Sequence, residues 1–141
     1  MMPIDKKIIL DRIAMIREDI QRLEKIRSMS LSEFKKNPDN YAIAEHHLRR
    51  ASESVFDIGR HIIARCGFTK ATDYTQIIDI LAENSVMPED FAHNFRKIGG
   101  FRNRIVHMYW KVTSDELYEV IKEDTSQLTK FTKYILIYIK K

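Results

Sequence analysis

The apolar residues of this chain recur at intervals of three and four positions along most of its length, and this spacing restricts the fold more than any other feature. Residues at these intervals lie on one face of an α-helix, which can pack against other helices. They predict one helix over about 5–27 and another over about 41–66, which Gly67 ends. The stretch between them is polar, and its Asn-Pro-Asp at 37–39 indicates a turn. The first stripe consists of Ile9, Ile13, Ile16, Ile20 and Leu23, and the second of Leu48, Ala51, Val55, Ile58 and Ile62.

Three more helices are expected in the second half of the chain. A short one covers about 74–83, and a longer one starts near Pro88, because a proline is tolerated in the first helical turn. Gly99 and Gly100 weaken that helix by about 1 kcal/mol each, so this pair suggests a kink or the close approach of another segment. Thr-Ser-Asp-Glu at 113–116 has the pattern of a capping box and opens the last helix.

These elements predict an all-α fold, an antiparallel bundle of four long helices and one short helix. Residues 1–141 are expected to form a single domain, because a chain of this length can bury a core without disulfides or metals. Only three prolines and four glycines are present, so few positions interrupt regular structure. Asp124 stands at one position where the apolar stripe of the last helix calls for a hydrophobic residue.

Cysteine count and charge indicate where such a chain works. Cys66 is the only cysteine, which rules out an internal disulfide and favours a reducing compartment. No secretory signal is recognisable, and the longest apolar run, at 134–139, is far too short to span a bilayer. We therefore expect a cytoplasmic protein without a membrane partner. A net charge of +4 and a pI near 9.2 permit a nucleic-acid partner without requiring one.

The segment 101–110, FRNRIVHMYW, concentrates groups that hold or transfer charge. On a helix Asn103 and His107 share one face, whereas Arg102 and His107 are separated by about 140° around the axis. Composition alone favours an ordinary interpretation, in which this is a helix end with an exposed basic patch. The same residue types also support a chemical interpretation.

The chemical interpretation is RNA cleavage without a metal. His107 can take a proton from a ribose 2′-hydroxyl, which then attacks the adjacent phosphate. Arg102 can stabilise the negative charge that grows on phosphorus, and Asn103 can fix a ring nitrogen or a phosphate. The product would be a 2′,3′-cyclic phosphate. One histidine per chain leaves the acid for the leaving group unassigned, and a two-fold dimer would supply a second copy.

The residues Arg102, Asn103, His107 and Tyr109 resemble the R-x4-H-x-Y motif of HEPN-domain toxins of the HepT type, from the MNT–HepT toxin–antitoxin systems of bacteria and archaea. The second-helix text AEHHLRRASESVFDIGRHIIARCGF is also similar to that family, as is GGFRNRIVHMYWKV followed by a capped last helix. The resemblance covers nearly the whole chain.

The resemblance implies a HEPN bundle that forms a homodimer, with a cleft at the interface lined by Arg102 and His107 of each chain. It implies metal-independent ribonuclease activity without a cofactor. The implied partner is a small MNT-type nucleotidyltransferase antitoxin that transfers AMP from ATP to Tyr109, where the bulky anionic adenylate blocks the cleft. Two alternatives stay open: a non-catalytic HEPN module that holds a nucleotide or a nucleotidyltransferase, and a purely structural helical dimer.

Two acids on the second predicted helix are further candidates. Glu53 and Asp57 are four residues apart and share a face, from which an acid could orient Arg102 or His107. We expect Asp57 to take this supporting role, and Glu53 to be solvated or paired with an arginine of its own helix. No metal-ligand spacing is recognisable among the remaining histidines, which are His46, His47, His61 and His93.

Overall fold

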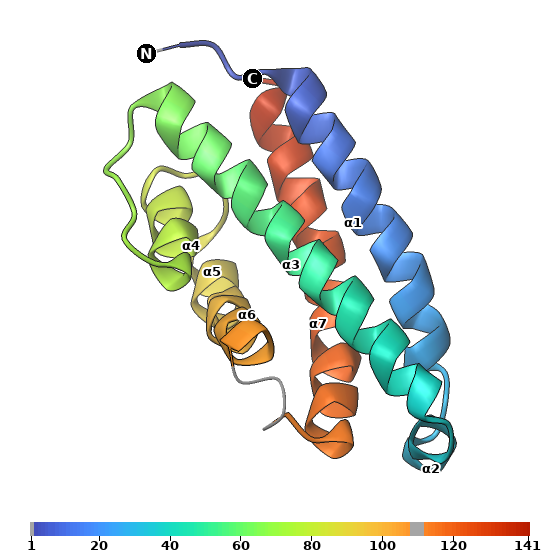
Figure 1. Ribbon diagram of the computed structural model, residues 1–141. Helices are drawn as coiled ribbons and strands as arrows, with labels where there is room; N and C mark the ends of the chain where they lie inside the picture. The colour runs from blue at the N-terminus through green and yellow to red at the C-terminus, as the bar shows by residue number, and fades with distance from the viewer. Residues whose placement is uncertain (1, 108–111) are drawn as a thin grey trace.

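The computed structural model describes residues 2–107 and 112–141, and these are helical with short connections (Figure 1). The all-α prediction is therefore confirmed. The described part of the chain forms seven helices, which are α1 (Lys6–Arg27), α2 (Leu31–Lys36), α3 (Pro38–Cys66), α4 (Tyr74–Glu83), α5 (Glu89–Phe95), α6 (Lys97–His107) and α7 (Ser114–Ile139).

Three long helices, α1, α3 and α7, make the body of the bundle, and α1 runs antiparallel to the other two (Figure 1). The prediction of a fourth long helix is wrong, because this stretch forms two shorter helices, α5 and α6. The division falls at Arg96, three residues before the glycine pair. It lets Phe91 and Phe95 pack against aromatic residues of α7, while α6 turns toward α3.

The polar stretch before α3 contains a helix that the apolar spacing did not reveal. Ser30 and Glu33 cap α2 reciprocally, and Phe34 is the one side chain that α2 buries. The expected turn at 37–39 is the junction of two helices. Asn37 caps α3, and Pro38 is its first residue, where a missing N–H costs nothing.

The apolar stripes meet in one continuous core. Ile9, Ile13, Ile16 and Leu23 of α1 are each at most 2% exposed, and they face comparably buried residues of α3 and α7. The stripe of α1 also contains Asp19, a fully buried carboxylate. A buried charge requires partners, so this residue marks a specific polar contact within the core.

A glycine sets the distance between α4 and α6. A Cβ added at Gly99 would lie 3.1 Å from the backbone nitrogen of Thr75 and 3.2 Å from the carbonyl carbon of Tyr74. The same atom at Gly100 would meet nothing within 4 Å. The predicted close approach of another segment is therefore confirmed for Gly99 and not for Gly100. None of the helices in the described ranges has an apolar stretch long enough to cross a membrane.

Candidate functional site

Arg102 is held on two sides by groups from other helices. Its Nε donates a hydrogen bond to Glu53 of α3, and its guanidinium carbon lies 4.2 Å from the centroid of the Tyr74 ring of α4. Only 13% of the Arg102 side chain is exposed. An arginine fixed by an ion pair and an aromatic face loses little further freedom when it binds an anion, because its rotamer is already set.

A groove between α3 and α6 runs past this arginine, with a volume of about 370 Å³. We call it the α3–α6 groove. Three guanidinium groups and one imidazole line it with a single carboxylate, and acids outside the lining pair with Arg49 and Arg50. Arginine matches phosphate oxygens with a planar fork of donors, which makes phosphate the natural ligand class. The lining residues are His46, Arg49, Arg50, Glu53, Arg102 and Val106.

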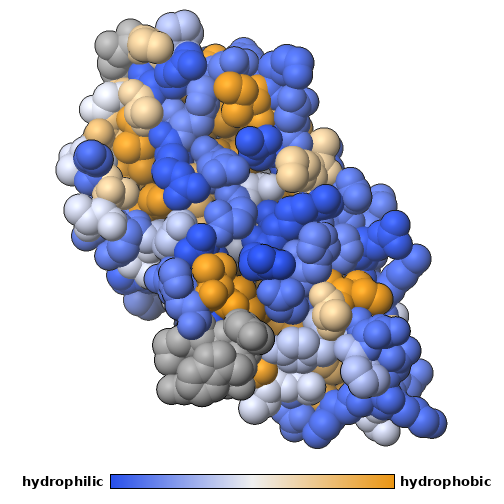
Figure 2. Space-filling view, in the orientation of Figure 1, coloured by the Kyte–Doolittle hydropathy of each residue, from blue (hydrophilic) through white to orange (hydrophobic). Residues whose placement is uncertain are grey.

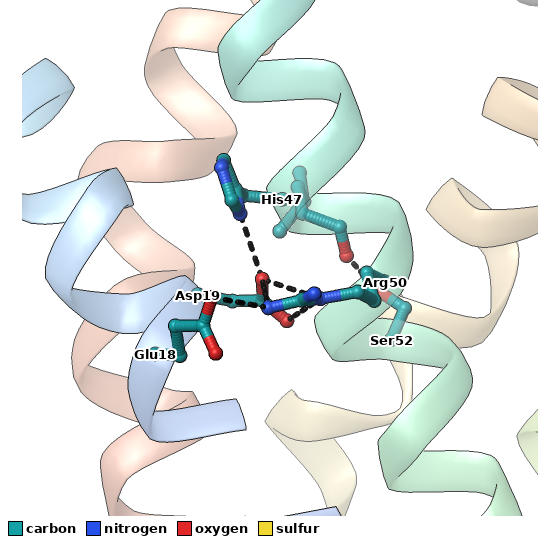
Figure 3. A network of polar contacts seen from close by, with 6 residues as sticks. Glu18, Asp19, His47, Arg50 and Ser52 are labelled. Atoms are coloured by element: carbon teal, nitrogen blue, oxygen red, sulfur yellow. Dashed lines mark hydrogen bonds and ion pairs between the residues drawn. The ribbon is translucent and has the colours of Figure 1, made fainter. Parts of the chain in front are cut away.

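The buried Asp19 of α1 fixes one of these arginines in place (Figure 3). The Nε of Arg50 donates to both carboxylate oxygens of Asp19, at 2.8 Å and 3.1 Å, and Glu18 lies 3.3 Å from its Nη2. His47 supplies its Nδ1 at 2.7 Å from the same carboxylate. The hydrogen bond from Arg50 to Asp19 raises the pKa of the guanidinium, which therefore stays charged. Arg50 is thus a positioned cation rather than a free surface arginine.

The two acids of α3 exchange the roles that the sequence suggested. Asp57 binds Arg12 at 3.1 Å and Arg60 at 2.9 Å, and in the described ranges it makes no hydrogen bond to Arg102 or His107. Glu53, expected to be solvated or paired within its own helix, is the acid that holds Arg102. One helical turn separates the two acids, and which turn faces α6 depends on helix packing.

Asn103 and His107 lie on the exposed side of α6. The Asn103 Oδ1 accepts a long hydrogen bond of 3.5 Å from Arg102. His107 is the last residue of α6 and is not among the residues that line the α3–α6 groove. Tyr109, the expected modification site, lies outside the described residues. The catalytic and modification roles of these residues stay predictions.

Two anchors hold the chain on either side of residues 108–111. Arg104 of α6 binds Glu116 of α7 at 2.7 Å, and the Tyr41 hydroxyl donates to the carbonyl of Val112 at 2.8 Å. The ion pair lowers the pKa of Glu116 and raises that of Arg104, so both stay charged. Thr113 caps α7 by accepting from the Glu116 N–H. The predicted capping box is only half formed. The Glu116 carboxylate binds Arg104 instead of the backbone N–H of Thr113.

No group of three or more histidine, cysteine, aspartate or glutamate side chains in the described ranges is arranged to hold a metal ion. The site that this geometry builds is instead a set of arginines with fixed positions.

The chain matches the ribonuclease HepT-like family over residues 16–135. It is 24% identical over 137 residues to a tRNA nuclease HepT of Aphanizomenon flos-aquae, covering 96% of this chain and 92% of that protein. It is 25% identical over 128 residues to an mRNA nuclease HepT of Shewanella oneidensis, covering 91% and 96% respectively.

Two solved structures share the fold. The cytosolic protein YutE of Bacillus subtilis has a TM-score of 0.87 at 21% identity, with 99% of this chain and 94% of that one covered. The tri-AMPylated HEPN toxin of Shewanella oneidensis, solved in complex with MNT antitoxin, has a TM-score of 0.82 at 25% identity, with 92% and 97% covered.

Proposed function

This chain belongs to the HepT-like ribonuclease family, and on that premise we propose that it is an RNA endonuclease and the toxin of a toxin–antitoxin pair. The observation that carries the proposal is the fixed position of Arg102, between Glu53 and Tyr74 at the wall of a groove rich in arginine. Such a groove suits an RNA backbone, since every nucleotide brings an anionic phosphate whatever its base.

In the proposed reaction, His107 takes the proton of a ribose 2′-hydroxyl, and the freed oxygen attacks the adjacent phosphorus. The bond from phosphorus to the 5′-oxygen breaks, and that oxygen leaves with a proton from a general acid. The products are a 2′,3′-cyclic phosphate and a 5′-hydroxyl. Arg102 stabilises the negative charge on the phosphoryl oxygens during this exchange.

His107 does not line the groove of its own subunit, so we propose that the active unit is a homodimer. A two-fold axis near the exposed face of α6 would bring Arg102 and His107 of both copies into one cleft. The second imidazole would then be the acid that protonates the leaving oxygen. Asn103, on the same face of α6 as His107, would orient the imidazole or the phosphate.

We further propose that a nucleotidyltransferase antitoxin of the MNT type controls this site by adding AMP to Tyr109. Tyr109 follows His107 by two residues, so their α-carbons lie within about 7 Å. Arg104 and Val112, on either side of that segment, are held by Glu116 and Tyr41. An adenylate there brings a phosphate that competes with RNA for the arginines and a bulky nucleoside that fills the cleft.

One observation favours a second candidate, a non-catalytic module that binds a nucleotide or a nucleotidyltransferase. Within one subunit, Arg102 lines the groove and His107 does not, as expected for an anion-binding surface without a base. This alternative predicts tight partner binding or AMP transfer that survives His107→Ala, with no RNA cleavage at any protein concentration.

The test is cleavage of RNA by the purified protein in the presence of EDTA. His107→Ala should abolish cleavage and leave the melting temperature close to wild type, because the side chain is exposed at a helix end. His93→Ala is the matched control, since His93 is also an exposed histidine near a helix end and should cut normally. Cleavage by His107→Ala at the wild-type rate would remove this residue from the mechanism.

The regulatory part has its own measurement. The protein is mixed with ATP and the product of the neighbouring gene, and its intact mass is recorded. One or more added adenylates that are lost in Tyr109→Phe would locate the modification, whereas unchanged addition to Tyr109→Phe would place it elsewhere.

A further inference from the structure

A second groove, of about 600 Å³, lies between the end of α3, the segment 67–73 and the start of α4. We call it the α3–α4 groove. Its floor is apolar and includes Ile63, Phe68 and Ile77, whereas Arg60 and Lys70 stand among the residues that line it. Figure 2 shows apolar side chains gathered over the end of α3 and the segment that leads to α4, with hydrophilic side chains around them.

We propose that the α3–α4 groove receives one unstacked base of the RNA substrate, beside the phosphate held by Arg102. This inference rests on the proposed function, because it adds a base site to the phosphate site of the α3–α6 groove.

The two grooves are neighbours, because a residue that lines one contacts a residue that lines the other. The Tyr74 ring lines the α3–α4 groove, and the guanidinium carbon of Arg102 lies 4.2 Å from the centroid of that ring. The guanidinium carbon of Arg60 lies 5.7 Å from the same centroid. The Tyr74 ring therefore contacts a cation of each groove. The two cations are close enough to meet adjacent nucleotides of one strand. A strand whose phosphate meets Arg102 has its neighbouring base at the opening of the α3–α4 groove.

The chemistry of the lining matches a base and its flanking phosphate. Every base has an apolar face, and single-stranded RNA is bound by stacking such faces on aromatic side chains beside a basic track. Phe68 supplies the aromatic surface, because the Tyr74 ring is already covered by Arg102 and packs against Phe56, and Arg60 and Lys70 supply the cations. The carboxylate of Asp73 is engaged in capping α4, where it accepts from the Gln76 N–H at 2.9 Å and the Thr75 hydroxyl at 2.7 Å.

The charge distribution distinguishes RNA from a hydrophobic protein segment. Glu53 and Asp57 are each paired with one of the arginines on Tyr74. The α3–α4 groove thus presents an apolar floor with Arg60 and Lys70 at its edge, and the Asp73 carboxylate that lines it caps α4. An anionic ligand with a flat apolar group fits this arrangement better than an apolar helix would.

The test compares two fluorescent probes of 12 nucleotide units each. One is a single-stranded RNA of mixed sequence, and the other is a chain of abasic ribose phosphates. Binding is measured by anisotropy with the His107→Ala protein, so that the RNA stays intact. Ala64→Trp fills the groove from an exposed position of its lining, and Phe68→Ala removes a stacking surface. Each should weaken RNA binding about tenfold and leave the abasic chain unaffected. Arg49→Ala, in the other groove, should weaken both probes alike.

Several results would overturn the proposal. One is an RNA affinity that is unchanged in Ala64→Trp. This result decides the question even if Phe68→Ala fails to fold. Another is an equal loss for the two probes, which would mean that the groove holds no base. A loss of dimerisation or of nucleotidyltransferase binding in Ala64→Trp, with RNA affinity intact, would assign the groove to a second copy or to the antitoxin. Absence of RNA cleavage by wild type would refute the proposed function instead, and the binding measurement would still decide the base site.

Discussion

The contact at Gly99 allows a prediction that compares two adjacent alanine variants. In Gly99→Ala the new methyl group would lie 3.1 Å from the Thr75 nitrogen and 3.1 Å from the Tyr74 Cβ, so α4 or α6 must shift by a few tenths of an ångström. Overpacking of this kind costs about 1–3 kcal/mol. Replacing a helical glycine with alanine returns about 1 kcal/mol. Gly99→Ala should therefore lower the free energy of unfolding by up to about 2 kcal/mol.

Gly100→Ala is the matched control, because its Cβ would meet no atom within 4 Å. Only the higher helix propensity of alanine acts at position 100, so this variant should be about 0.5–1 kcal/mol more stable than wild type. Urea denaturation measures both. RNA cleavage should fall in Gly99→Ala, because a shift of α6 moves Arg102 away from the Tyr74 ring, and should persist in Gly100→Ala. Equal stabilisation by the two alanines would refute the argument that Gly99 sets the distance between α4 and α6.

Two further variants test a buried and a half-buried carboxylate, Asp19 and Asp124. Asp19→Ala should destabilise the protein by about 3–5 kcal/mol, because it leaves Arg50 and His47 without their carboxylate, and denaturant unfolding should show a far smaller change in Glu18→Ala. Asp124→Asn should stabilise the protein by up to about 3 kcal/mol at pH 8 and hardly at pH 4. Burial raises the pKa of Asp124 to about 6, so its stabilising contribution is present below its unfolded pKa near 3.8 and is lost as the pH rises through 6. Thermal melts across this pH range measure the effect, and an equal gain at both pH values would contradict it.

Much of this fold follows from patterns that are local in the sequence. Periodic apolar residues and caps located α4 within its observed bounds and α1 to within one residue, because these signals act over one or two helical turns. The helix α2 was missed because it buries a single side chain, Phe34, although Ser30 and Glu33 already formed a capping pattern. The division at Arg96 had no local signal, since it serves the packing of α5 and α6 against different neighbours.

The candidate site also combines residues that the sequence reveals with contacts that depend on helix packing. Arg102 and His107 stand out in the sequence because their chemistry is unusual for one short segment. The partners of Arg102 do not, because Glu53 and Tyr74 come from α3 and α4 and meet it only once three helices have packed. The choice between Glu53 and Asp57 depends on the rotation of α3 relative to α6, which no local pattern specifies.

The contacts of the long helix α3 limit where a chain with this fold can gain or lose residues. It contributes Arg50, Glu53, Asp57 and Arg60 to contacts in three directions within eleven consecutive positions. One residue inserted between Arg50 and Arg60 would rotate everything beyond it by about 100° and break several of these contacts together. An insertion in 67–73 would leave them all in phase. We therefore expect related chains to differ in length at that connection and to keep a constant spacing along this stretch of α3.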